Sequence, residues 1–180
     1  MLSREDARKL LYEMTETSSL RRHARTVELV MEALAQHFDE DVEKFAITGL
    51  LHDADYEKYP NRHPELIVEK LHSLGESEIA HAIEGHYTIW GIPRISTLDK
   101  CIVAADEITG FIVASALIRP DRLEGLSAKS VMKKFKTKTF AATVDRDECI
   151  RGAQLLGWEL PQLIDFIIPV LQRNSEELAL

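Results

Sequence analysis

The chain has 180 residues, of which 45% are hydrophobic and 29% are charged, and its formal net charge is -8. This length and apolar content suffice for one hydrophobic core, so we expect a single domain over residues 1–180. The negative charge provides no diffuse basic field for a polynucleotide backbone, which argues against broad nucleic-acid binding. Apolar runs are broken before they reach a membrane span, and residues 1–14 are rich in charge. We therefore expect a cytoplasmic protein without a membrane segment.

The spacing of apolar residues predicts an all-α, single-domain helical bundle. Apolar positions recur every three or four residues along almost the whole chain, and no alternating strand pattern persists. Proline and glycine punctuate this pattern at positions such as Pro60, Gly75 and Pro120, while Pro64 suits the first turn of a helix. The expected helices cover residues 4–14, 18–37, 41–54, 64–74, 76–86, 97–118, 128–135, 145–156 and 160–173.

Polar residues interrupt the apolar stripes of two of these helices. His23 shares a helical face with Val27, and Asp106 shares one with Ile102, so both polar side chains are expected to point inward. The pair His52-Asp53 follows the apolar segment ITGLL at the end of the third helix. Imidazole nitrogen and carboxylate oxygen are suitable ligands for a divalent metal, which indicates a metal site where several helices converge.

Each candidate ligand also has a purely structural interpretation. A single inward histidine such as His23 is more often a hydrogen-bonded core residue, and Asp106 alone would suit pairing with an arginine. His63 begins a helix, where polar residues are ordinary, and His86 ends one, where an imidazolium suits the helix dipole. The joint occurrence of these residues favours the metal site. The remaining histidines are expected at the surface or in caps: His37, His72 and His81.

The two cysteines do not add to this ligand set. Cys101 and Cys149 lie in predicted helices and lack CxxC spacing. We therefore expect neither a disulfide framework nor a cysteine zinc site.

The ordered set His23, His52-Asp53 and Asp106 resembles the HD superfamily of metal-dependent phosphohydrolases. Four stretches between residues 52 and 157 resemble its HDIG-type branch: HDADYEKYPNRHPE, ADEITGFIVASALIRP, KSVMKKFKTKTFA and DRDECIRGAQLLG. The resemblance implies metal binding by these four residues. It also implies an HD domain with a metal-ligand core over about residues 18–118 and C-terminal helices over 127–175 that pack on it.

Two further histidines extend the resemblance to a dinuclear site. His63 and His86 occupy the places at which dinuclear members of the superfamily, such as diadenosine tetraphosphate hydrolases, add two ligands. The resemblance then implies two divalent ions, of Fe, Mn, Co or Zn, with Asp53 as the catalytic bridge and water between the ions as the nucleophile. Tyr87 stands where cyclic-di-GMP phosphodiesterases carry a second histidine, so we set that activity aside.

The expected substrate is a small phosphate ester or anhydride, such as a nucleotide. The candidates for binding its negative charge are basic: Lys133, Lys134, Lys136, Lys138, Arg22 and Lys58. A solvated helix end explains the four clustered lysines equally well. Asp55 or Glu57 is a candidate to orient a metal-binding histidine, because such imidazoles usually donate their other N–H to an acceptor.

The sequence is also compatible with two other functions and with a homo-oligomer. Some HD-fold proteins with six such ligands hold a mixed-valent di-iron centre and act as oxygenases. A non-catalytic nucleotide-sensing module would keep the metal for structure. The apolar residues of the last predicted helix, Phe166, Ile167, Val170 and Leu171, suit either the core or a homo-oligomer contact.

Overall fold

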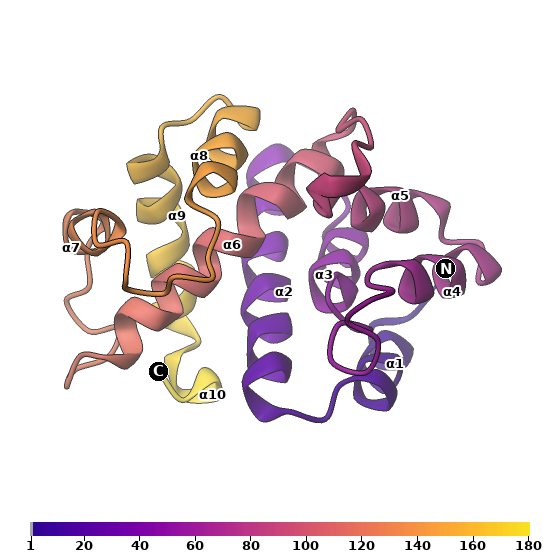
Figure 1. Cartoon of the computed structure of the whole chain (residues 1–180), viewed down its shortest axis with the longest axis horizontal. Helices are drawn as coiled ribbons and strands as arrows, with labels where there is room; N and C mark the ends of the chain where they lie inside the picture. Colours follow the sequence, from indigo (N-terminus) through magenta and orange to yellow (C-terminus); the bar gives the residue numbers. More distant parts are fainter. Residues whose placement is uncertain (1) are drawn as a thin grey trace. The chain divides into compact units, whose positions relative to one another are not determined.

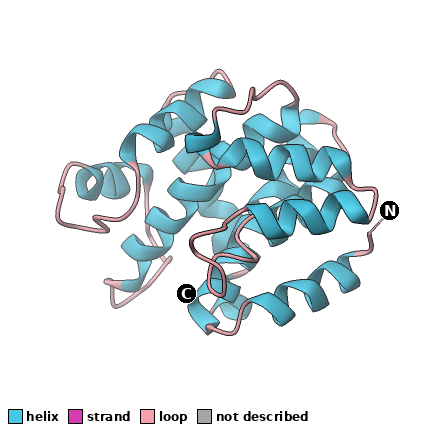
Figure 2. Ribbon diagram, turned by 45° about the vertical axis from the view of Figure 1, so that its right-hand side comes forward, coloured by secondary structure: helices cyan, strands magenta, loops and turns pink. Residues whose placement is uncertain are grey.

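The computed structural model describes residues 2–180, which form helices, turns and loops without a strand (Figures 1 and 2). The all-α prediction is confirmed. The elements in chain order are α1 (Arg4–Met14), α2 (Ser18–Phe38), α3 (Val42–Leu51), α4 (Glu65–Ser73), α5 (Ser77–His86), the 3-10 helix η1 (Thr88–Trp90), α6 (Thr97–Leu117), α7 (Ala128–Phe135), α8 (Arg146–Leu155), α9 (Leu160–Arg173) and α10 (Ser175–Leu178). None of the helices over residues 2–180 combines the length and the apolar character that crossing a membrane requires.

Side-chain caps explain why several helices start where the sequence predicted. The Ser3 hydroxyl accepts a hydrogen bond from the backbone N–H of Asp6 at the start of α1, and Asp41 accepts one from the N–H of Lys44 in α3. Asp145 accepts bonds from two backbone N–H groups in the first turn of α8. Each cap satisfies a donor that has no partner within its own helix.

The third helix is shorter than predicted. It ends at Leu51, with His52 as its C-cap, whereas the sequence suggested an end near Ala54. Consecutive turns follow from His52 to Lys58, and the hydroxyl of Thr15 donates a 2.9 Å hydrogen bond to the Ala54 carbonyl. Pro64 precedes α4 as its N-cap instead of lying in the first turn, and neither η1 nor α10 was predicted.

The chain divides into two compact units, Met1–Ile102 and Val103–Leu180, and α6 runs through the boundary. In the first unit, α1, α3, α4 and α5 contribute a core that includes Leu11, Leu51, Ile67, Leu71 and Ile83. The prediction of one domain over residues 1–180 stays a prediction.

The second unit has its own buried aromatic and aliphatic side chains. Phe111 of α6 contacts Phe135 and Phe140 edge-on, at ring-centroid distances of 5.3 and 5.4 Å. The Arg146 guanidinium lies 5.0 Å from the Phe111 ring centroid, in cation–π geometry. The apolar face of α9 supplies further buried residues, among them Leu163 and Ile167.

Candidate metal centre

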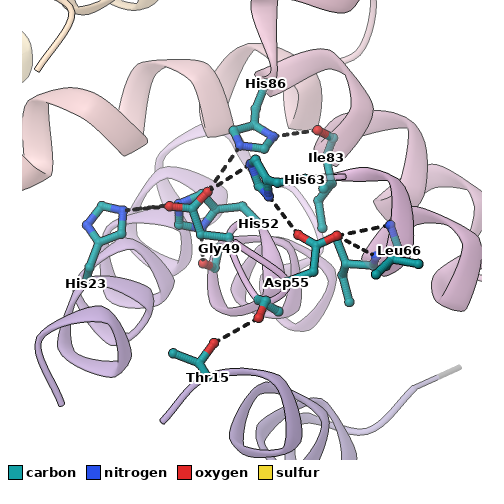
Figure 3. Close-up of polar contacts among 12 residues, drawn as sticks. Thr15, His23, Gly49, His52, Asp55, His63, Leu66, Ile83 and His86 are labelled. Atoms are coloured by element: carbon teal, nitrogen blue, oxygen red, sulfur yellow. Dashed lines mark hydrogen bonds and ion pairs between the residues drawn. The ribbon is translucent and has the colours of Figure 1, made fainter. Parts of the chain in front are cut away.

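Four histidines of the first unit meet in space around one aspartate, Asp53. Figure 3 labels the four histidines. His23 comes from the first turns of α2, and the pair His52-Asp53 follows the last residue of α3. His63 lies in the turns before α4, and His86 is the last residue of α5. The end of one helix therefore lies against ligand candidates from three other segments, which is the convergence that the sequence predicted.

Asp53 lies at the centre of this group, and its two carboxylate oxygens face different histidines. Oδ2 lies 3.7 Å from His23 Nε2 and 3.5 Å from His52 Nε2. Oδ1 lies 3.3 Å from His63 Nε2 and 3.6 Å from His86 Nε2. The carboxylate thus stands between two pairs of imidazoles, and each pair faces one oxygen.

Three of the four imidazoles are oriented by an acceptor at their other nitrogen. The Nδ1 atom of His52 lies 2.8 Å from the Gly49 carbonyl, and that of His86 lies 2.5 Å from the Ile83 carbonyl. His63 Nδ1 lies 2.7 Å from Asp55 Oδ1. Because a carbonyl or carboxylate oxygen only accepts, each Nδ1 carries the proton and each Nε2 is left as a lone-pair donor toward Asp53.

The group is buried on one side and open on the other. The side chain of His52 is fully buried, and those of His63 and His86 are 6% and 5% exposed. The side chains of His23 and Asp53 are 21% and 25% exposed. A ligand from solvent therefore reaches the group past Asp53 and His23.

This donor set fits a metal ion. His23, His52 and Asp53 offer ligand atoms that lie within 4.8 Å of one another, and Asp53, His63 and His86 offer a second such group. The Nε2 atoms of His23 and His52 are only 3.2 Å apart and turn toward the same carboxylate oxygen. Converging imidazole nitrogens with a shared carboxylate are a suitable environment for iron, zinc, cobalt or manganese.

A match to a protein-family model identifies the family of this chain. The model of the HD domain matches residues 20–110, which include all five residues of the group and Asp106. The chain belongs to the HD domain family. HD domains bind divalent metals, and the family lies in a superfamily of metal-dependent phosphohydrolases. Comparisons with curated proteins and with solved structures find no significant match.

In this HD domain, Asp55 is the acceptor that the sequence suggested for a metal-binding histidine. Its side chain is fully buried, and while Oδ1 faces His63, Oδ2 accepts 3.0 Å hydrogen bonds from the backbone N–H groups of Leu66 and Ile67. These two N–H groups belong to the first turn of α4, so one carboxylate both caps this helix and orients a ligand candidate.

The neighbouring Glu57 and Lys58 make contacts away from the histidines. Glu57 accepts hydrogen bonds from the backbone of Glu16 and from the backbone and hydroxyl of Thr17, and these bonds lower the pKa of its carboxyl group. Lys58 donates a 2.6 Å hydrogen bond to the Glu13 carbonyl and pairs with Glu16 at 3.2 Å. Both residues tie the turn after α3 to the segment between α1 and α2.

The remaining predicted site residues are Asp106, Arg22 and four lysines. Asp106 lies on α6 within the second unit, and its role as a ligand stays a prediction. The four lysines of the basic cluster, Lys133, Lys134, Lys136 and Lys138, are exposed at the end of α7 and just beyond it. Arg22 precedes His23 on α2 and is half-buried. Their roles in substrate binding stay predictions as well.

The two carbonyl groups that orient His52 and His86 were not predicted from the sequence. In both cases the carbonyl belongs to the residue three positions earlier, in the last turn of a helix. Carbonyls of the last turn have no partner within the helix, so a histidine at a helix end is well placed to donate to one of them. The position of His52 and His86 at predicted helix ends was therefore a usable signal.

Proposed function

We propose that this HD domain is a dinuclear metal-dependent phosphohydrolase that acts on a small phosphate ester or anhydride. The position of Asp53 is the observation that carries this proposal. Its Oδ2 faces His23 and His52, whereas its Oδ1 faces His63 and His86. A carboxylate whose two oxygens serve two separate nitrogen pairs is suited to bridging two cations.

Under this proposal His23, His52 and Asp53 would hold one ion, and Asp53, His63 and His86 would hold the second. Iron, manganese, cobalt and zinc all accept such mixed nitrogen and oxygen ligation. Asp106 is proposed as a further ligand on the sequence resemblance alone.

The ions would polarise phosphate oxygens and lower the pKa of a water molecule toward neutrality. In the hydrolysis, the water oxygen forms a new bond to phosphorus while the bond from phosphorus to the leaving oxygen breaks, and that oxygen takes up a proton. The protein's own side chains orient the groups that take part in the reaction. The hydrogen bonds at Nδ1 of His52, His63 and His86 fix the direction of each Nε2, and the greater exposure of Asp53 and His23 leaves a path for substrate.

Charge neutralisation of the substrate phosphate needs cations besides the metal ions. Arg22, next to His23 in the sequence, and the exposed cluster at Lys133, Lys134, Lys136 and Lys138 are proposed for this role. Lys58 is the weaker candidate because it is paired with Glu16.

The proposal is tested by phosphate release from a panel of nucleotides and simple phosphate esters, with Mn²⁺ or Co²⁺ and without oxygen. We expect hydrolysis by the native protein and a loss of at least 100-fold in Asp53→Asn, because the bridge is removed. Asp39→Asn is the matched control, since Asp39 is exposed and has a left-handed backbone conformation that asparagine tolerates.

Two outcomes would contradict the proposal. Activity that appears only with iron and O₂, together with oxidation of the substrate, would favour a di-iron oxygenase of the HD fold. Nucleotide binding without turnover of any phosphorylated or oxidisable compound would favour a sensing module.

A further inference from the structure

Three aromatic side chains lie beside the histidines of the first unit. Tyr56 follows α3, Tyr87 follows α5, and Trp90 ends η1; we call them the aromatic rim. The His63 ring contacts the rings of Tyr56 and Tyr87 edge-on, in both cases at a centroid distance of 5.5 Å. Tyr87 in turn contacts Trp90 at 5.9 Å. A continuous series of ring contacts therefore leads outward from a candidate metal ligand.

Two residues of the rim are exposed to solvent, and Tyr87 between them in the series is half-buried. Trp90 is 40% exposed and Tyr56 is 48% exposed, although large aromatic side chains gain most from burial. Exposed apolar side chains that stand alone are ordinary on a protein surface, but a contiguous aromatic group next to a reactive site is typical of ligand binding.

Packing explains only part of the rim. Tyr56 and Tyr87 support the His63 imidazole by edge contacts, which is a structural role. Trp90 contacts Tyr87, one ring further from the histidine, and leaves two-fifths of its surface to solvent. These contacts leave the exposed part of the Trp90 indole without a packing role.

We propose that the aromatic rim stacks against the planar base of a nucleoside phosphate whose phosphate group lies at the histidines. The inference rests on the proposed function and names its substrate class. Every base has a π face, so stacking on Trp90 and Tyr56 would accept all four common bases with little discrimination. Binding through the base would distinguish nucleotides from sugar phosphates.

Tryptophan fluorescence provides a readout that does not depend on catalysis. The chain has two tryptophans, so Trp158→Phe leaves Trp90 as the single reporter. We expect adenosine 5′-monophosphate to quench Trp90 emission saturably in the presence of Mg²⁺. Ribose 5-phosphate, which has the same sugar and phosphate but no base, should not quench it.

Kinetics supply the second readout. Trp90→Ala should raise KM for adenosine 5′-monophosphate about tenfold, the effect of one lost stacking contact, and leave KM for ribose 5-phosphate unchanged. Trp90→Phe should restore most of the loss because it keeps a ring. Ile89→Ala is the matched control, since Ile89 lies in the same 3-10 turn, is 79% exposed and lacks a ring.

Each outcome has one meaning. Equal binding of both probes without quenching would overturn the stacking proposal and leave the hydrolase proposal intact. A Trp90→Ala variant with lower kcat for both substrates, or with a changed oligomeric state and an unchanged KM, would also overturn it in favour of a structural or docking role. Saturable quenching by the nucleotide without hydrolysis of any phosphate ester would support stacking while the hydrolase proposal fails.

Discussion

At the scale of single residues, the site depends on which nitrogen of each imidazole is protonated. Asp55 decides this for His63, because its carboxylate lies 2.7 Å from Nδ1 and accepts a hydrogen bond from the Nδ1–H group. The sequence predicted the histidines and Asp53, since these residue types occur in a recognisable order. It suggested Asp55 or Glu57 as the orienting acid without separating them, because their contacts depend on how the turn after α3 folds.

Asp55→Asn is expected to weaken metal binding at His63 by about 10- to 100-fold. The amide oxygen can still accept the N–H groups of Leu66 and Ile67, which directs the amide NH₂ toward His63 Nδ1. His63 would then carry its proton on Nε2 and lose its lone pair on the metal side. Titration of metal-free protein with Zn²⁺ or Co²⁺ measures the effect.

The control for this substitution is Glu57→Gln. Glu57 is an acid of the same turn that contacts Glu16 and Thr17 instead of a histidine. Equal losses of metal affinity in both variants would contradict the orienting role of Asp55.

At the scale of helices, close contact between α2 and α3 brings His23 and His52 together. A methyl group at Gly49 would lie 2.9 Å from the Val27 carbonyl and 3.0 Å from the Glu28 Cα, which are backbone atoms of α2. The two helices can approach this closely only without a side chain at Gly49. The helix boundaries were largely predictable from caps and breakers, but this packing distance was not, because it depends on tertiary contacts.

Gly49→Ala is therefore expected to destabilise the fold by about 1–3 kcal/mol, the usual effect of overpacking, in spite of the better helix propensity of alanine. It should also weaken metal binding, because α2 carries His23 and α3 positions His52. Urea unfolding and metal titration measure the two effects.

Gly85→Ala is the matched control for Gly49→Ala. Gly85 lies in α5, and a methyl group there would meet only the flexible Arg94 side chain, at 3.8 Å. Its alanine variant should be as stable as the native protein or more stable by up to about 1 kcal/mol. Destabilisation of Gly85→Ala as large as that of Gly49→Ala would contradict the close-approach explanation.

A buried glutamate joins α1 to α2. Glu28 is fully buried, and its carboxylate lies 2.8 Å from Arg25, 3.7 Å from Arg4 and 3.8 Å from Arg8. Burial raises the pKa of Glu28 above the ordinary value of a glutamate, and the arginines offset this only in part. The folded state therefore binds a proton at Glu28 more tightly than the unfolded state does.

The sign of the resulting pH dependence follows from the raised pKa. The contribution of Glu28 to the free energy of unfolding is fully present below the pKa that its carboxyl group has in the unfolded chain, and it is lost as the pH rises through the folded-state pKa. Relative to Glu28→Gln, the native protein should lose stability over this pH window. Urea unfolding of both proteins between pH 4 and 8 measures the difference, and parallel pH profiles would contradict the assignment.

At the scale of the whole chain, the two cysteines report on separate units. Cys101 lies in the first unit and Cys149 in the second, and both thiols are buried. Burial raises the pKa of Cys101 to about 12 and also raises that of Cys149. Thiol reagents at pH 8 should therefore react slowly with the native protein and rapidly with both cysteines in urea.

Metal binding should slow the labelling of Cys101, because the five clustered ligand candidates belong to its unit and a ligand that binds only the folded state stabilises it. Mass spectrometry of labelled peptides separates the two sites. Rapid labelling of Cys101 in the native metal-bound protein would contradict the burial that the structure shows.

The most direct test of the dinuclear centre is the number of metal ions bound per chain. Equilibrium dialysis of metal-free protein against Mn²⁺, Co²⁺ or Zn²⁺, followed by elemental analysis, gives this number for the native protein and for His63→Ala. We predict about two ions per chain in the native protein, because Asp53 faces two histidine pairs, and about one in the variant. A native value of one that is unchanged in His63→Ala would contradict the dinuclear centre.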